Sequence, residues 1–183
     1  NLVWEKICAD IMDNQLDVPL GILKLPVPLK EDYNRRQKLI ELIEKPLWTI
    51  TGKCAKDTLI PDLVSICKVN DQHQFIIFDA KYYNAHLEKG IVPTGQPGIE
   101  SITKQYLYQL AYQRFIEDHK FSSVKNCFLL PTENNEIEDK GEVRMEMLSN
   151  LGLQDIKIRL IPATMAYDLY LSGSKMDMER LDL

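Results

Sequence analysis

The sequence lacks a hydrophobic run long enough to cross a membrane. Its apolar runs extend over only a handful of residues, such as Phe75–Phe78, whereas a bilayer requires roughly 20. The first residues, Asn1–Glu5, also lack the initiating Met, the basic stretch and the apolar stretch of a signal peptide. We therefore expect no membrane association. The missing Met leads us to expect the C-terminal fragment of a longer chain.

A metal-binding pattern of cysteine and histidine is also absent. No CxxC pair and no HxH or HxxxH spacing occurs, which excludes a zinc signature. The four cysteines are widely spaced, at Cys8, Cys54, Cys67 and Cys127. Unpaired cysteines of this kind are typical of reduced, buried thiols in a cytosolic protein.

The chain has no surplus of positive charge. Its 22 Lys+Arg and 27 Asp+Glu give a net charge of −5, which argues against a free-standing DNA-binding module because DNA affinity depends on neutralising phosphates. No GxxxxGK[ST] sequence is present, so the motif of NTP hydrolysis is missing. The hydrophobic content of 45% excludes intrinsic disorder, and the length suits one domain over residues 1–183.

Hydrophobic periodicity predicts an α/β protein. Helical spacing of apolar residues predicts helices at 2–16, 31–44, 99–120 and 163–171. Apolar and β-rich runs predict strands at 47–51, 59–69, 75–83, 124–130, 142–148 and 156–161. We expect loops at 93–98 and 131–141, a frayed C-terminal end over the last ten residues, and both tryptophans, Trp4 and Trp48, in the core. The order ααβββαβββα predicts a mixed β-sheet flanked by helices.

The strands at 59–69 and 75–83 predict a hairpin that carries charged residues at one end. Pro61-Asp62 opens the first strand, and Asp79-Ala-Lys81 closes the second. Side chains at i and i+2 share a strand face, so Asp79 and Lys81 point the same way, and antiparallel pairing brings Asp62 near them.

The register of this hairpin presents a difficulty. A turn centred on Gln72 sets Asp62 opposite Tyr82, which is the wrong face by one residue. We therefore expect a slip or a β-bulge, a feature that is over-represented beside active sites.

Two carboxylates and a lysine at one sheet end indicate phosphodiester hydrolysis. Carboxylates at close range repel each other unless a cation lies between them, and Mg²⁺ prefers such oxygen ligands. The metal activates water, and a lysine offsets charge that develops on the phosphate. The alternative is a solvated strand end with a surface ion pair, because [DE]xK also occurs at 118–120, 138–140 and 155–157.

Ile60-Pro-Asp62 followed by Phe78-Asp-Ala-Lys81 resembles the PD-(D/E)xK nuclease superfamily. With Val3-Trp-Glu-Lys6 on the first helix, and Lys104-Gln105 with Tyr108 on a later one, the chain is similar, over about residues 2–172, to the nuclease region of LlaJI-type restriction endonucleases, which are related to McrBC. The resemblance implies a restriction-endonuclease-like fold and DNA cleavage that depends on Mg²⁺, for which Mn²⁺ substitutes, to leave 5′-phosphate ends.

The resemblance also assigns roles to residues. It implies that Asp62, Asp79 and the backbone carbonyl of Ala80 bind the metal and that Lys81 positions and activates the attacking water. Glu5, on the first helix, would reach the metal or a metal-bound water. For Glu5 an ordinary helix-surface charge is an even alternative.

Four residues of the helix at 99–120 complete the expected site. By resemblance, Gln105 contacts the active site or the DNA backbone, and Tyr108 and Lys104 contact DNA. Gln109 lies on the same helix face as Gln105 because the two are four residues apart, so the choice between them stays open. For the tyrosine the alternative is a helix that packs its aromatic side chains on the sheet.

The resemblance implies a multi-subunit restriction system in a prokaryotic cytoplasm. The expected partners are double-stranded DNA, an N-terminal DNA-recognition domain in the longer chain, an AAA+ GTPase motor subunit and a second copy, because cutting both strands requires two sites. Two alternatives remain: a catalytically silent domain of the same fold used for assembly, and a repair or mobile-element nuclease that acts on flaps or ends.

Overall fold

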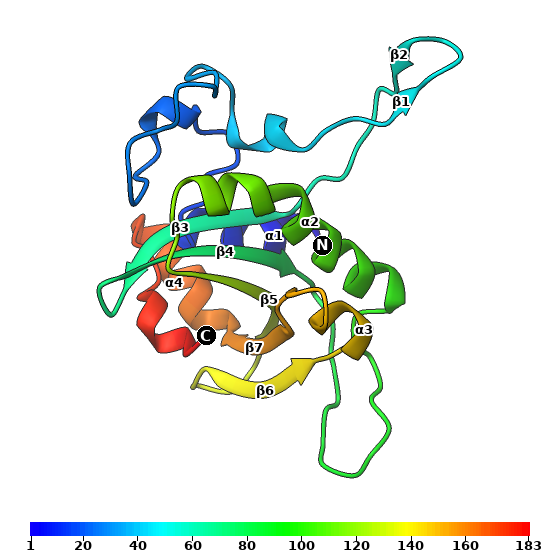
Figure 1. Cartoon of the computed structure of the whole chain (residues 1–183). Helices are drawn as coiled ribbons and strands as arrows, with labels where there is room; N and C mark the ends of the chain where they lie inside the picture. Colours follow the sequence, from blue (N-terminus) through cyan, green and yellow to red (C-terminus); the bar gives the residue numbers. More distant parts are fainter.

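The structure, a computed structural model that describes all residues 1–183, is built on a five-stranded mixed sheet in the order β3-β4-β5-β7-β6 (Figure 1). The strands are β3 (Leu63–Val69), β4 (Gln72–Ala80), β5 (Ser123–Thr132), β6 (Glu138–Val143) and β7 (Ile156–Pro162). β4, β5 and β7 run parallel, and β3 and β6 are antiparallel to their neighbours at the two edges. The expected mixed sheet flanked by helices is confirmed.

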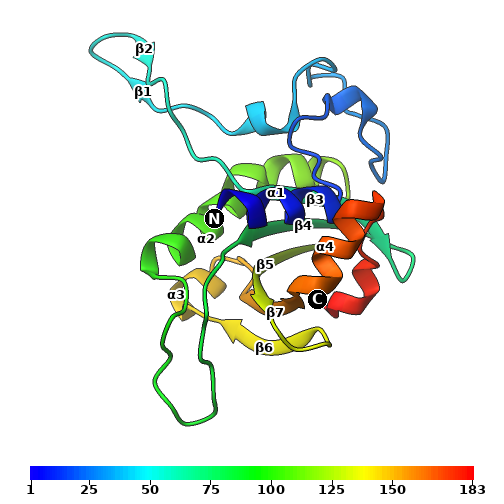
Figure 2. The same ribbon diagram turned by 180° about the vertical axis from the view of Figure 1, so that it is seen from behind.

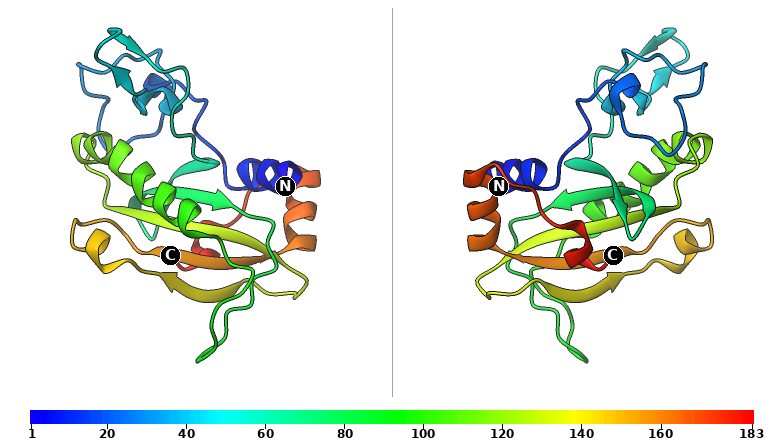
Figure 3. Two further views of the ribbon diagram at one scale, coloured as in Figure 1. Left: turned by 90° about the vertical axis from the view of Figure 1, so that its right-hand side faces the viewer. Right: turned by 90° about the vertical axis from the view of Figure 1, so that its left-hand side faces the viewer.

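Helices cover both faces of the sheet (Figure 3). They are α1 (Leu2–Ile11), α2 (Ile99–Asp118), the short α3 (Glu146–Ser149) and α4 (Ala163–Ser172), with 3₁₀ turns at Leu20–Ile22, Leu39–Leu42 and Met178–Leu181. No helix has the length and apolar character needed to cross a membrane.

The side chains of β4 alternate between two cores. Ile76, Phe78 and Ala80 pack with α1 and α4 in one cluster, whereas Phe75 and Ile77 pack with α2 in another. This alternation follows from the two-residue period of a strand. Asp79, which falls in the second series, is therefore directed to the face covered by α2.

The predicted helix at 31–44 is wrong. Only Leu39–Leu42 forms a 3₁₀ turn, because backbone hydrogen bonds to residues 16–21, together with isolated turns, take the place of a continuous helical ladder. The Leu39 N–H donates to the Val18 carbonyl (3.1 Å), and the Leu20 N–H donates to the Gln37 carbonyl (2.8 Å). Leu39 and Ile43 still reach the α2-side core. The helical periodicity was therefore produced by burial of an extended segment.

Several other expectations need correction. The strand expected at 142–148 begins earlier, at Glu138, and gives way to α3. Residues 47–51 form only β1 (Leu47–Trp48), which pairs with β2 (Lys53–Cys54) in a separate hairpin that projects from the body (Figure 2). Trp4 is buried as expected, but Trp48 is 65% exposed. Among the free cysteines, Cys54 is exposed and not buried.

The expected frayed C-terminal end is also wrong. The Met176 N–H donates to the Ile11 carbonyl (2.8 Å), and Leu181 is buried in the α1–α4 core. The buried Arg159 guanidinium on β7 donates to the carbonyls of Leu181 (2.6 Å) and Asp182 (2.7 Å). One arginine therefore attaches the last residues to the sheet.

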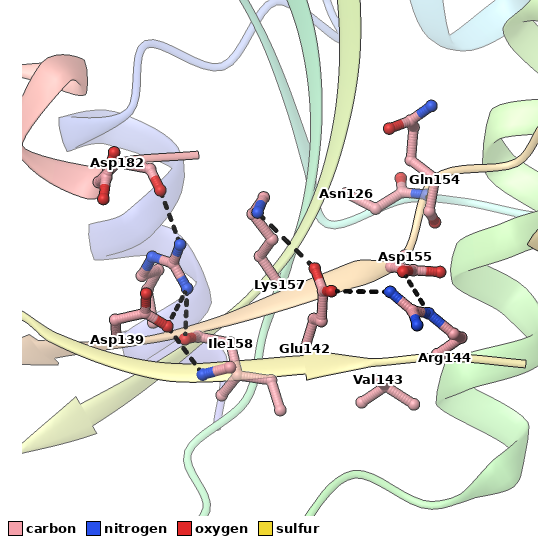
Figure 4. Close-up of polar contacts among 12 residues, drawn as sticks. Asn126, Asp139, Glu142, Val143, Arg144, Gln154, Asp155, Lys157, Ile158 and Asp182 are labelled. Atoms are coloured by element: carbon pink, nitrogen blue, oxygen red, sulfur yellow. Dashed lines mark hydrogen bonds and ion pairs between the residues drawn. The ribbon is translucent and has the colours of Figure 1, made fainter.

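Ion pairs connect the edge strand β6 to β7. Arg159 pairs with Asp139 at 2.8 Å, and Figure 4 shows Glu142 between Lys157 (3.7 Å) and Arg144 (3.2 Å). The pairs with Lys157 and Arg144 are solvent-accessible and each contributes less than about 1 kcal/mol. They lie beyond the register shift between Asp139 and Glu142, where the strands resume pairing.

Replacing Arg159 by Met is expected to loosen the C-terminal segment. The variant leaves the carbonyls of Leu181 and Asp182 without their donor and Asp139 without its partner, so we expect a loss of about 3 kcal/mol in the free energy of unfolding. Urea denaturation measures the loss, and carboxypeptidase digestion should release the last residues faster. Arg180→Met, at an exposed position, serves as the control; equal effects of the two changes would contradict the role of Arg159.

Candidate active site

The register of the β3–β4 hairpin is set by a two-residue turn. Val69 pairs with Gln72, and Asn70 and Asp71 between them have φ of 51° and 62°. Positive φ at both central residues is the requirement of the type I′ turn, which matches strand twist. The turn is therefore centred on Asn70-Asp71, not on Gln72, and the ladder from there to Leu63↔Phe78 is regular.

This register removes the need for a bulge. One step beyond the Leu63↔Phe78 pair, Asp62 stands opposite Asp79, on the same face. The predicted meeting of the two aspartates is confirmed. Of the two corrections that we expected, the shifted register is confirmed and the bulge is wrong, because the turn is centred on Asn70-Asp71 and the ladder from it is regular.

Pro61 and Asp62 together determine how the hairpin ends. A ladder continued to Pro61 would set it opposite Ala80, but proline has no N–H to donate to the Ala80 carbonyl, and the regular pairing ends at Leu63↔Phe78. The Ala80 N–H, which points to the same side, donates to Asp62 Oδ2 at 2.9 Å. A side-chain carboxylate thus replaces a backbone acceptor, and no strand donor faces the Ala80 carbonyl at this position.

Burial and the neighbouring Asp79 make the Asp62 carboxyl group harder to ionise. Asp79 is buried, with 6% of its surface exposed, and Asp62 is half-buried. Burial, followed by a hydrogen bond and the charge of Asp79, raises the pKa of Asp62 from 3.8 to about 7, although Lys81 and the Ala80 N–H act in the opposite direction. Ionisation of Asp62 is therefore disfavoured in the folded protein unless a further cation is present.

Lys81 completes the charged cluster. Its Nζ lies 2.8 Å from Asp79 Oδ1, and its backbone N–H donates to the Leu129 carbonyl of β5 at 3.0 Å. Burial lowers the pKa of Lys81, but the hydrogen bond to Asp79 and the charges of both aspartates outweigh it and raise that pKa above its ordinary value. The lysine is thus a fixed cation in contact with the pair.

Tyr108 on α2 reaches the same cluster. Its hydroxyl donates to the Ile60 carbonyl at 3.1 Å, which holds the segment that leads into Asp62. Burial, then the charges of Asp79 and Asp62, raises the pKa of Tyr108 to about 12. The tyrosine is therefore neutral and positions the first aspartate, while its predicted contact with DNA stays a prediction.

Gln105 lies one turn earlier on α2 and is fully buried. Its Nε2 donates to the Ile77 carbonyl of β4 at 2.8 Å, and its Oε1 is buried without a hydrogen-bond partner. A buried amide oxygen without a partner is costly. The catalytic role of Gln105 stays a prediction.

Glu5 lies on α1, whose core contacts are on the opposite face of the sheet from Asp79. Its side chain is partly exposed. Burial is the main cause that raises the pKa of the Cys8 thiol. The negative charges of Asp62 and Glu5 add to this rise. The structure contains no group of three or more His, Cys, Asp or Glu side chains placed to hold a metal, and metal binding by Glu5 stays a prediction.

Gln109 and Lys104 have partners away from the aspartates. Gln109 Oε1 accepts from Asn126 Nδ2 (3.1 Å) and from the Gln154 N–H (2.9 Å), which connects α2 to β5 and the segment before β7. Lys104 pairs with Glu100 at 2.7 Å on the exposed side of the helix. Of the two candidate glutamines, only Gln105 has a free buried oxygen, and contact with DNA stays a prediction for Gln109 and Lys104.

The structure also has a cavity beside Lys81 that the sequence analysis did not predict. It has a volume of about 540 Å³ and is lined by residues 82–85, by residues 131–134 after β5, and by Leu160 and Ala163. Ligands of parallel sheets bind beyond the carboxyl ends of the strands. The strand ends at residues 80 and 132 were therefore the signal that indicated this location.

A mixed sheet flanked by helices, with two aspartates and a lysine at the end of its hairpin, is compatible with the restriction-endonuclease-like class of fold. Residues 1–167 match the family described as LlaJI restriction endonuclease. The chain belongs to this family, and the resemblance seen in the sequence is confirmed. Family membership supports a nuclease role.

A curated relative points to the same kind of system. The Type II restriction enzyme BsuMI component YdjA of Bacillus subtilis (strain 168) is 26% identical to this chain over 185 residues. The match covers 98% of the chain and 34% of that protein, so the chain spans about a third of the relative's length. No solved structure matches the chain.

The raised pKa of Asp62 predicts a pH-dependent stability in the absence of metal. Because the folded protein holds the Asp62 proton more tightly than the unfolded chain, its stability should fall as the pH rises from about 4 to about 7. Asp62→Asn should remove this fall and stabilise the protein at pH 7.5 by about 2 kcal/mol, after allowance for solvent screening.

Thermal unfolding in EDTA across this pH range measures the effect. The matched control is Asp57→Asn, a change at an exposed acid five residues earlier in the chain than Asp62. A wild-type Tm that stays flat from pH 4 to pH 7 would contradict the elevated pKa.

Proposed function

We propose that this chain is a metal-dependent endonuclease domain that hydrolyses phosphodiester bonds of double-stranded DNA and leaves 5′-phosphate ends. The observation that carries the proposal is the register that sets Asp62 opposite Asp79, with Lys81 in contact with the pair. Two adjacent acids oppose folding when both are ionised. A silent assembly domain would gain nothing from such a pair, whereas a cation-binding site requires it.

The donor set fits Mg²⁺. The carboxylates of Asp62 and Asp79 and the carbonyl of Ala80 would hold the ion, with water as the remaining ligands. The supporting observation is that burial and the neighbouring Asp79 raise the pKa of Asp62 even with Lys81 beside the pair, so a further cation would relieve the repulsion that remains. When bound, Mg²⁺ supplies charge neutralisation at the phosphate and a more acidic water.

The protein's own groups supply orientation and charge. Lys81, held by Asp79, would donate a hydrogen bond to the attacking water and offset the negative charge that develops on the phosphate. Tyr108 holds the Ile60 carbonyl and thereby fixes the strand that carries Asp62. Gln105 Oε1 would accept a hydrogen bond from a water at the site, which would satisfy its buried oxygen.

We further infer that the chain works within a multi-subunit restriction system in the prokaryotic cytoplasm. The support is the family and the relative whose name identifies it as a component of a Type II restriction enzyme. A net charge of −5 provides little general affinity for DNA. We therefore propose that a DNA-recognition domain and an AAA+ GTPase subunit deliver the DNA, and that two copies cut the two strands.

Lys81→Ala tests the active site directly. We expect metal-dependent nicking of supercoiled plasmid by the wild-type protein and a loss of about 100-fold or more in the variant, because the charge opposite the phosphate is removed. Lys68→Ala, at an exposed position near the far end of β3, should nick like the wild type. Equal nicking by Lys81→Ala and the wild type would exclude Lys81 from catalysis.

Metal binding can be tested without cleavage. Millimolar Mg²⁺ or Mn²⁺ at pH 7.5 should raise the Tm of the wild-type protein, because a ligand that binds only the folded state stabilises it. The rise should disappear in Asp79→Asn and persist in Asp57→Asn. An equal rise in all three proteins would indicate that the ion binds elsewhere.

A further inference from the structure

The hairpin of β1 and β2 is a preformed two-stranded ribbon that projects from the body (Figures 1 and 2). Trp48 pairs with Lys53 and Leu47 pairs with Cys54. The Trp48 carbonyl accepts from the N–H groups of Thr51 (3.1 Å) and Gly52 (2.9 Å) and from the Thr51 hydroxyl (3.0 Å). These bonds close the tip, so its side chains are presented by an ordered turn.

The ribbon exposes large apolar side chains. Leu47 is 60% exposed, Trp48 is 65% exposed and Ile50, at the tip, is 100% exposed. Exposed apolar groups concentrated on one ordered projection mark an interaction site. The core of the chain makes no use of them.

The charge of the ribbon distinguishes it from the rest of the surface. Residues 45–56 include Lys45, Lys53 and Lys56 and no Asp or Glu, in a chain of net charge −5. All three lysines are exposed. Lys53 shares a ribbon face with Trp48 because the two are cross-strand partners. An aromatic ring and a cation on one face suit a polyanion that also offers flat or apolar groups, which describes a nucleic acid.

A short segment of chain, held by hydrogen bonds, connects the ribbon to the candidate active site. The Ala55 N–H donates to the Pro46 carbonyl at 2.7 Å and closes its base. The chain then passes through Ile60, whose carbonyl is held by Tyr108, into Asp62. Eight residues from Cys54 to Asp62 span at most about 30 Å. The base of the ribbon therefore lies within about one turn of B-form DNA, roughly 34 Å, of Asp62.

We propose that the β1–β2 ribbon binds the major groove of duplex DNA beside the cleavage site. A two-stranded ribbon fits this groove, which is about 12 Å wide. Trp48 and Ile50 would contact base edges, and Lys53 and Lys56 would contact phosphates. This inference rests on the proposed function, because it supplies the DNA contact that the acidic body of the domain lacks.

Fluorescence anisotropy with short mixed-sequence duplexes in EDTA tests the ribbon without cleavage. Lys53→Gln with Lys56→Gln should reduce the slope of log affinity against log salt by about 1.8, which corresponds to two lost phosphate contacts. Trp48→Ala with Ile50→Ala should lower affinity about tenfold and leave that slope unchanged, because apolar contacts release no counterions.

The control removes the same charge elsewhere. Lys68→Gln with Lys120→Gln alters exposed lysines at the opposite end of the sheet, where the Ser122 N–H donates to the His73 carbonyl. This control should retain wild-type affinity and slope. All the altered positions are exposed, and an unchanged Tm confirms folding.

The outcomes separate the ribbon from the cleavage chemistry. Ribbon variants that bind DNA like the control would overturn the inference, and the apolar tip would then belong to a protein contact. In that case nicking that still depends on Lys81 would leave the proposed function standing. Nicking that does not depend on Lys81 would contradict the proposed function, while the binding measurements would still decide the role of the ribbon.

Discussion

The candidate active site depends on two residues that are not part of it. Asn70 and Asp71 adopt the left-handed conformations that allow a two-residue turn, and the turn fixes which β3 residue faces which β4 residue. A shift of one residue would move every side chain of a strand to the other face. Asp62 would then leave Asp79, and the Ala80 N–H would lose its carboxylate acceptor. The chemistry at one end of the hairpin is therefore set by backbone conformation at the other.

The fold keeps an electrostatically unfavourable pair in place by packing both faces of the strand that carries it. Ile76, Phe78 and Ala80 are fully buried against the α1–α4 side, and Phe75 and Ile77 are fully buried against α2. Apolar burial on this scale, about 25 cal/mol for each Å² removed from water, outweighs the repulsion of two carboxylates. β4 therefore ends rigidly, and the positions of Asp79 and Lys81 are decided by the core, not by their own contacts.

The strongly patterned elements could be read from the sequence and the long-range pairings could not. The apolar strand that ends in Asp79-Ala-Lys81, the helix that carries Gln105 and Tyr108, and the sequence Pro61-Asp62 identified the site. The sequence did not reveal that residues 31–44 would pair with residues 16–21, because extended and helical segments bury similar apolar residues. Nor did it reveal the anchoring of the C-terminal segment, which depends on Arg159, a residue more than 20 positions away from the carbonyls that it holds. The hairpin register was missed because positive φ at Asn and Asp is permitted but not required.

The contact between the two ends of the chain has a consequence for biosynthesis. Trp4 and Ile7 of α1 share one core with Ala166, Met176 and Leu181, and the Met176 N–H bonds to the Ile11 carbonyl. Domains fold as units during translation, and pairings between distant segments form late. The core behind Ala80 therefore stays incomplete until residues 176–181 have left the ribosome and packed against α1. In a nascent chain, Asp62, Asp79 and Lys81 therefore gain the rigid support of this core only after residues 176–181 have been synthesised.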